Sequence, residues 1–389
     1  MSETSVNPDY MLSEMLEQPK ILDSIYNDIN LKNIVKKLFN NDVERIILTG
    51  SGDSYCAAWF GAYLGQRWRP DLDIRHYAPF EFVNYFNPQD LPKSVVIGLS
   101  VSGNTPRVVE VLRFAHKYGA QTLGITDNPQ GKVATEADHT LFIHASPPDT
   151  LETSSYRANG AKEYTGYHHD VAQTKTYMGN LATQSMLMAY LSSQDEAALT
   201  LVQEAFQLVN KAINQRKIFI KLGTNLGKNS DKIIFVSSGP NSTTGLFGAY
   251  KTFEFSLNGF ACDIEEYCHT NYFITTNNSL VIFIASNFPT YNRIREIEPV
   301  IRDVIKAKTI VLVNSEIYKE GETVFHYVPL ETTKTEVLSP LIFAIPVEFL
   351  TYSIAKSKGF DTNTFRGGQD TEKYVSGSYI TIRQSKVHY

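Results

Sequence analysis

Residues 97–105 read Ile-Gly-Leu-Ser-Val-Ser-Gly-Asn-Thr, and this short stretch decides the fold because it joins two segments of different periodicity. Residues 95–99 form a short, continuous apolar run, which favours a buried strand. Residues 108–115 carry apolar side chains at helical spacing. The stretch therefore predicts a strand, a tight turn and the first turn of a helix, the unit from which parallel α/β sheets are built.

The turn between these two elements is rich in hydroxyl groups. Ser100, Ser102 and Thr105 can each donate a hydrogen bond, and the N–H groups in a helix's first turn have no partners within the helix. Together, such groups suit a phosphate. A plainer interpretation is that Ser102 or Asn104 only caps the helix. For this turn alone the two interpretations are equally good, but a second, similar unit later in the chain favours a phosphate site.

Composition and charge narrow the class of protein. The chain has 389 residues, of which 42% are hydrophobic and 20% charged, as in soluble globular proteins of one large or two ordinary domains. A net charge of −5 without a basic block argues against nucleic acid as a partner. We expect no membrane span, because no apolar run reaches about 18 residues, and the N-terminus has no signal-peptide pattern. Three cysteines at no metal-ligand spacing indicate a reduced, cytoplasmic protein without a metal site.

Strand and helix patterns alternate along the first half of the chain. Residues 9–40 have the spacing of a single amphipathic leader helix. The polar, Pro-, Ser- and Thr-rich residues 144–173 interrupt the alternation and predict a long loop that includes His168 and His169. Helices are expected at 174–193 and 195–216, and strands at 45–49, 73–77, 95–99, 121–126 and 139–143.

The same order then repeats about 187 residues further on. Residues 232–236 match 45–49, and both runs lead through a small polar turn into a helix of small residues. Apolar runs at 280–285 and 309–314 match later strands of the first half. We therefore predict an α/β fold of two tandem, doubly wound parallel-sheet units, each flavodoxin-like with three αβα layers, and a ligand cleft between them.

The second copy lacks the serine-rich turn, which predicts one phosphate site rather than two. The expected boundaries are a leader at 1–40, a first unit with its following helices at 41–216, a second unit at 217–365, and a tail at 366–389 that closes on the site.

Four motifs, in this order, resemble those of the sugar isomerase (SIS) family. They are Tyr-Met-Leu-Ser-Glu-Met-Leu-Glu-Gln-Pro at 10–19, Gly-Ser-Gly-Asp-Ser-Tyr at 50–55, Ser-Val-Ser-Gly-Asn-Thr at 100–105 and Val-Ala-Gln-Thr-Lys-Thr-Tyr at 171–177. The resemblance covers about residues 9–383. It is specifically to the isomerase half of glucosamine-6-phosphate synthase and to stand-alone, deaminase-like relatives.

The resemblance implies roles for particular residues. The serine-rich turn would bind the 6-phosphate of a sugar. Glu254, in a Lys-x-x-Glu context, would move a proton between C1 and C2, work that suits a carboxylate whose pKa a cleft raises. His269, on a loop, would open the sugar ring in a neighbouring subunit's site, and Lys373 would close over the sugar. The binding residues implied are Ser54, Ser100, Val101, Ser102, Thr105, Val171, Gln173 and Lys251.

Each catalytic assignment has a plainer alternative. Glu254 could be a surface helix glutamate, with Glu265 or Glu266 serving as the base instead. His269 could be a structural histidine, and Lys373 a solvated tail lysine.

The resemblance implies a phosphosugar isomerase or deaminase that converts a 6-phosphorylated aminosugar, such as glucosamine 6-phosphate, into fructose 6-phosphate and ammonia. The chain begins Met1-Ser2 and runs directly into the leader, so we expect no glutaminase part. No metal or organic cofactor is required. The alternatives are a fructosamine-6-phosphate deglycase and a non-catalytic sugar-phosphate sensor.

A homodimer with shared active sites is also expected. The resemblance implies it, and the aromatic side chains of Tyr267, Tyr272 and Phe273 give independent support, because aromatic residues are enriched at protein interfaces. The alternative is that these aromatic residues pack on the chain's own core.

Overall fold

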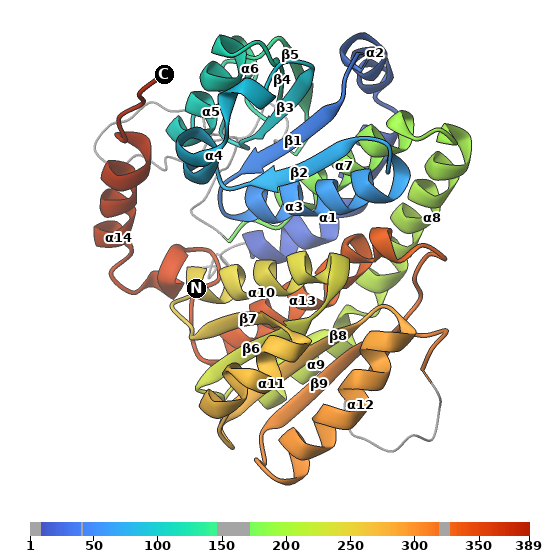
Figure 1. Ribbon diagram of the computed structural model, residues 1–389. Coiled ribbons are helices and arrows are strands. Elements are labelled where there is room, and N and C mark those ends of the chain that lie inside the picture. The colour runs from blue at the N-terminus through green and yellow to red at the C-terminus, as the bar shows by residue number, and fades with distance from the viewer. Residues whose placement is uncertain (1–8, 40–41, 146–171, 319–326) are drawn as a thin grey trace, which may run out of the picture.

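The structure, a computed structural model, describes residues 9–39, 42–145, 172–318 and 327–389. The predicted long loop at 144–173, with His168 and His169, falls almost wholly outside these residues, as does the implied binding residue Val171. Within them, the chain forms two parallel sheets separated by a layer of helices (Figure 1).

The first sheet has the strand order β2-β1-β3-β4-β5, and every neighbouring pair is parallel. Its strands are buried along nearly their whole length at β1, β3 and β4, as expected when helices cover both faces of a parallel sheet. The strands are β1 (Arg45–Gly50), β2 (Asp73–Tyr77), β3 (Ser94–Leu99), β4 (Gln121–Thr126) and β5 (His139–Phe142).

The second sheet repeats this order as β7-β6-β8-β9-β10, again with all pairs parallel. The predicted tandem α/β duplication is therefore confirmed, although the edge strands β7 and β10 were not predicted. Its strands are β6 (Lys232–Ser237), β7 (Gly259–Asp263), β8 (Ser279–Ala285), β9 (Lys308–Asn314) and β10 (Tyr327–Leu330).

Helices lie on both faces of each sheet, and one continuous core joins the two inner faces. On β1, Ile46 and Leu48 point into this shared core, whereas Ile47 points to the outer face under α4 and α5. The inner layer contains α1 (Tyr10–Tyr26), α3 (Asp53–Trp68), α7 (Lys175–Leu191), α8 (Asp195–Asn214), α9 (Arg216–Gly227), α10 (Ser242–Glu254) and α13 (Ser339–Ser357). The remaining helices are α2 (Ile29–Leu38), α4 (Pro79–Tyr85), α5 (Pro106–Lys117), α6 (Lys132–Glu136), α11 (Ile264–His269), α12 (Phe288–Asp303) and α14 (Thr371–Ser378).

Two helical predictions need correction. The leader is two helices rather than one, because Asp28 caps a new helix by accepting a hydrogen bond from the N–H of Asn30. Helix α9 was also missed; it starts directly after α8 and packs on α13. Gly223 permits that close packing, since a Cβ there would lie 2.0 Å from Ser353 Oγ.

One segment is more apolar than the sequence reading allowed. Residues 336–357 are long and apolar enough, by composition, to cross a membrane, with a mean hydropathy of 1.7 in the most apolar window. That window is 94% buried, and its helix α13 packs on α7, α8, α9 and α10. Burial against helices on several sides explains the composition, so this is a core helix.

Candidate active site

The two predicted substrate-binding loops meet at one edge of the first sheet. Strands β1 and β3 are neighbours with Gly50 opposite Leu99, so the loops that follow them leave the sheet side by side. Gly50 is required for this arrangement, because a Cβ there would lie 2.6 Å from the main chain of Ser54. Ser54 is consequently buried in the first turn of α3, against the end of β1.

The serine-rich turn is preorganised by its own hydrogen bonds. Ser100 Oγ and Thr105 Oγ1 lie 2.9 Å apart, and the side-chain amide of Asn128 donates to the carbonyl of Ser102 at 3.0 Å. The carbonyl of Val101 accepts from the N–H of Asp127. These hydrogen bonds fix the conformation of the turn at the start of α5.

Helix capping does not use the hydroxyl groups of this turn. The N-cap of α5 is Thr105, and its side chain makes no capping hydrogen bond; neither Ser102 nor Asn104 occupies that position. In the described part of the chain, the N–H groups of Val101, Ser102 and Thr105 donate to no protein oxygen. Main-chain donors and hydroxyls at a helix start are the groups that bind phosphate elsewhere.

Lys251 connects this sheet edge to the second unit. Its ammonium group lies 2.7 Å from Asp53 Oδ2, 2.7 Å from Glu254 Oε2 and 3.0 Å from the carbonyl of Gln173. Burial opposes the charge of Lys251, but the nearby Asp53 and Glu254 carboxylates outweigh it and raise the lysine pKa. Because Asp53 opens α3 directly after β1, and β3 is a neighbour of β1, the bridge connects Glu254 to the edge of the sheet at which the serine-rich turn follows β3.

Glu254 has the electrostatic character of a general base. Burial raises its pKa from 4.5 to about 7, against the lowering effect of the Lys251 charge, and the charge of Asp53 raises it further. Its side chain is nevertheless 25% exposed, so a small molecule can reach it. Within the described residues, Glu254 Oε2 forms the ion pair with Lys251 but accepts no aligned hydrogen bond. A carboxylate with a pKa near 7 can both take and return a proton at neutral pH.

Helix α1, the first helix of the leader, positions the segment that precedes α7. Glu14 Oε2 accepts from the N–H of Thr174 at 3.0 Å and from the N–H of Lys175 at 3.3 Å, which satisfies donors at the start of α7. The same segment carries the Gln173 carbonyl that faces Lys251. The motifs at 10–19 and 171–177 therefore act together, by positioning Lys251.

Comparison with known proteins identifies a domain in the first half of the chain. Residues 40–162 match a family model described as the SIS domain. Over 374 residues the chain is 26% identical to the isomerizing glutamine–fructose-6-phosphate aminotransferase of Thermococcus kodakarensis, covering 93% of this chain but only 57% of that protein. The chain thus spans little more than half the length of this relative. The chain therefore contains a SIS domain.

Two solved structures show how far the SIS fold is shared. The C-terminal domain of glucosamine-fructose-6-phosphate aminotransferase from Francisella tularensis has a TM-score of 0.75 at 18% identity, covering 93% of this chain and 100% of that chain. Glucosamine-6-phosphate deaminase from Thermotoga maritima has a TM-score of 0.62 at 18% identity, covering 91% and 96% of the two chains. At these identities, the likeness concerns the fold alone.

Two predicted catalytic residues, His269 and Lys373, make no recorded contact with Glu254 in the described part of the chain. His269 is the last residue of α11 rather than part of a loop, because Asp263 caps that helix by accepting from the N–H of Glu265. His269 and Lys373 are both exposed, and Lys373 lies near the ring of its neighbour Tyr374. Among the described residues, no hydrogen bond or ion pair connects His269 or Lys373 to Glu254. Their catalytic roles stay predictions.

The aromatic residues after β7 divide between core and surface. Tyr267 is fully buried, donates or accepts a 3.0 Å hydrogen bond with Thr275, and packs edge-to-face on Phe283. The prediction that Tyr267 lies at an interface is therefore wrong, because its ring is buried in the chain's own core under α11. Phe273, in contrast, is 78% exposed.

The corresponding turn of the second SIS unit is filled by the chain's own carboxylate. Glu336 Oε1 accepts from Ser286 Oγ at 2.8 Å and from the Asn287 amide at 2.6 Å, at the start of α12. The donors that follow β8 thus have an internal acidic partner. The side chains of Ser286 and Asn287 are thus already hydrogen-bonded within the chain.

Three polar residues of the site were missed by sequence reading. Asp53 and Glu14 lie inside the quoted motifs, so their positions were a usable signal, but their acceptor roles depend on tertiary contacts. Glu348 on α13 is fully buried and accepts from the Gln18 amide at 2.7 Å. The apolar sequence of α13 does not indicate that its one glutamate is hydrogen-bonded to Gln18.

Proposed function

We propose that this SIS-domain protein is a phosphosugar isomerase whose substrate is a 6-phosphorylated aminosugar, with glucosamine 6-phosphate as the leading candidate. One observation carries the proposal: Lys251 forms ion pairs with Glu254, a carboxylate with a pKa of about 7, and with Asp53, which follows the strand next to the one that precedes the serine-rich turn. The relatives named above support the substrate class, since their names refer to fructose 6-phosphate and glucosamine 6-phosphate.

The proposed reaction starts with the ring-opened aminosugar, its phosphate held at the serine-rich turn and its C1–C2 region next to Glu254. Ionised Glu254 removes the proton from C2, and the electrons form a C1–C2 double bond while the π electrons of the C1 carbonyl move to O1, which takes up a proton from water. Glu254 returns that proton to C1, which leaves an imine at C2. Water adds to the imine and ammonia leaves, so that glucosamine 6-phosphate and water give fructose 6-phosphate and ammonia.

The residues around Glu254 make this proton transfer feasible. Lys251 keeps a fraction of the carboxylate ionised at neutral pH, and the buried surroundings keep its pKa far above that of a solvated glutamate. We further propose that His269 opens the sugar ring in the site of a second copy of the chain, which accounts for its exposed position away from Glu254.

Glu254→Gln tests this function directly. It keeps the size of the side chain but removes the base, so turnover should fall about 10²- to 10⁴-fold while phosphosugar binding persists. Ammonia and fructose 6-phosphate are measured from a panel of phosphorylated aminosugars. Full activity of Glu254→Gln would refute the assignment and direct attention to Glu265 or Glu266. If the wild type binds a panel member tightly but turns none of them over, a sensor is favoured. If it releases glucose 6-phosphate from a fructosamine-6-phosphate adduct, a deglycase is favoured.

A further inference from the structure

The C-terminal segment places a positively charged side chain, that of Arg383, at the serine-rich turn. After α14, the chain runs along one side of the molecule and ends beside the first SIS unit (Figure 1). There the guanidinium of Arg383 donates to Ser102 Oγ at 2.8 Å, across 281 residues of sequence. We propose that Arg383 is a ligand of the substrate phosphate; this inference rests on the proposed function.

Helix α5 anchors the segment that holds Arg383. The Arg107 guanidinium donates to Ser385 Oγ at 2.7 Å and also to the carbonyl of Lys386. Glu110, which is almost fully buried, accepts from the N–H of His388 at 2.8 Å.

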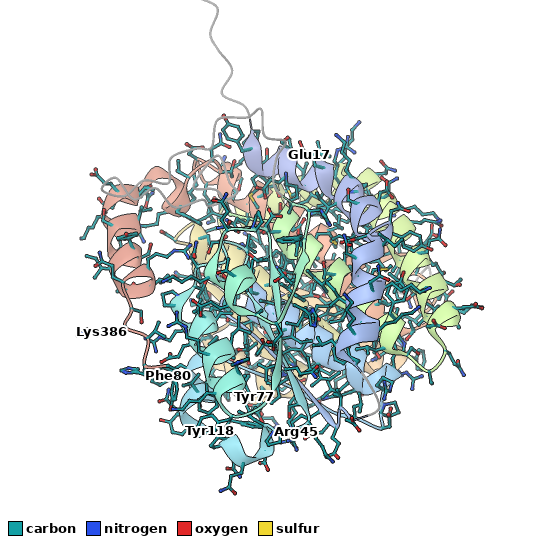
Figure 2. All side chains as sticks on the ribbon, turned by 90° about the horizontal axis from the view of Figure 1, so that it is seen from above. Glu17, Arg45, Tyr77, Phe80, Tyr118 and Lys386 are labelled. Carbon is teal, nitrogen blue, oxygen red and sulfur yellow. The ribbon has the colours of Figure 1, made fainter. Side chains whose placement is uncertain are left out.

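The last residue strengthens this anchor. The Tyr389 ring packs edge-to-face on Phe114 with 5.0 Å between centroids, and the Arg113 side chain donates to the Tyr389 main-chain oxygen at 3.0 Å. Figure 2 shows Lys386 at the periphery of the molecule, on the same side as Phe80 of the first unit. Since α5 begins at the serine-rich turn, one helix positions both the turn and the segment that reaches it.

The chemistry of the turn explains why a guanidinium is useful there. The turn offers the hydroxyl groups of Ser100, Ser102 and Thr105 and main-chain N–H groups, all of them neutral donors, whereas a sugar phosphate carries about 1.5 to 2 negative charges at pH 7. A guanidinium has five N–H donors in a fixed plane, so it can keep its bond to Ser102 and still donate to a phosphate oxygen. Charge-assisted bonds of this kind are about twice as strong as neutral ones.

Arg383 therefore makes the site selective for phosphate esters over neutral sugars. A suitable probe is glucitol 6-phosphate, whose open chain has no carbonyl group and cannot be isomerised. Its binding is compared with that of glucitol by calorimetry, for the full chain and for the variants Arg383→Gln and Arg383→Lys. Lys386→Gln is the matched control, because it removes one positive charge from an exposed side chain three residues further along the same segment.

Arg383→Gln should bind glucitol 6-phosphate about 10- to 100-fold more weakly than the wild type, with glucitol binding unchanged. Arg383→Lys should recover part of the loss, because it keeps the charge but not the planar set of donors. Lys386→Gln should bind like the wild type. Circular dichroism and thermal melting confirm that each variant folds.

Two results would overturn the inference without touching the proposed function. One is equal affinity of Arg383→Gln and wild type for glucitol 6-phosphate; the other is an equal loss with Lys386→Gln, which would indicate a general charge effect. A wild type that binds glucitol 6-phosphate no better than glucitol would instead refute the phosphate turn itself, and with it the proposed function.

Discussion

The substitution Glu348→Gln should make the protein progressively more stable than the wild type as the pH rises above 5, because it replaces a carboxyl group that the folded protein keeps protonated. Glu348 is fully buried on α13, where its Oε2 accepts from Gln18 and, within the described residues, its Oε1 has no partner. Burial raises the pKa of Glu348 from 4.5 to about 8. At pH 7 the folded protein therefore holds a proton on this carboxyl that the unfolded chain has released.

The sign of the pH dependence follows from proton linkage. Between pH 4.5 and about 8 the folded state binds more protons at Glu348 than the unfolded state, so the unfolding free energy falls as the pH rises. The slope approaches about 1.4 kcal/mol per pH unit, which gives a loss of about 2–3 kcal/mol between pH 5 and pH 7. Glutamine has the same shape, keeps an oxygen for the Gln18 bond, and does not titrate.

The assay is denaturant unfolding at pH 5, 6 and 7, followed by fluorescence of Trp59 and Trp68. The free-energy difference between Glu348→Gln and wild type should move in favour of the variant by about 2–3 kcal/mol from pH 5 to pH 7. Glu44→Gln is the control, because it makes the same chemical change at a side chain that is 68% exposed, whereas the effect predicted for Glu348 requires burial. A difference that stays constant with pH would refute the reasoning.

Three further predictions concern catalysis and assembly. Ser102→Ala should raise the KM for a 6-phosphosugar about 10- to 100-fold, because a charge-assisted hydrogen bond contributes about 1.5–3 kcal/mol; an unchanged KM in a folded variant would exclude this turn. The kcat/KM should rise with pH, with a midpoint at about pH 7, as Glu254 ionises. Asp53→Asn should shift this midpoint to lower pH, because the charge of Asp53 raises the pKa of Glu254. A midpoint that does not move would contradict this coupling. If a homodimer shares its active sites, mixing inactive Glu254→Gln with inactive His269→Ala should restore part of the activity. Mixtures that contain heterodimers but stay inactive would place both residues in the site of one subunit.

The amino-acid sequence by itself determined the repeating architecture and the position of the serine-rich turn. Strands such as Ser94–Leu99 and Lys308–Asn314 were predicted to within a residue at each end, because their apolar runs and flanking turn residues act over a few neighbouring positions. The edge strand Gly259–Asp263 was missed, since its burial is only partial and its pattern is correspondingly weak.

The tertiary structure alone decided which groups meet. Lys251 and Asp53 are 198 residues apart in sequence, and Arg383 and Ser102 are 281 apart, yet each pair lies within hydrogen-bond distance. Such contacts depend on how whole helices pack against two sheets, and no short-range periodicity records that packing. The raised pKa values of Glu254 and Glu348 have the same origin, because burial is a property of the assembled core and not of the residues beside them in the chain.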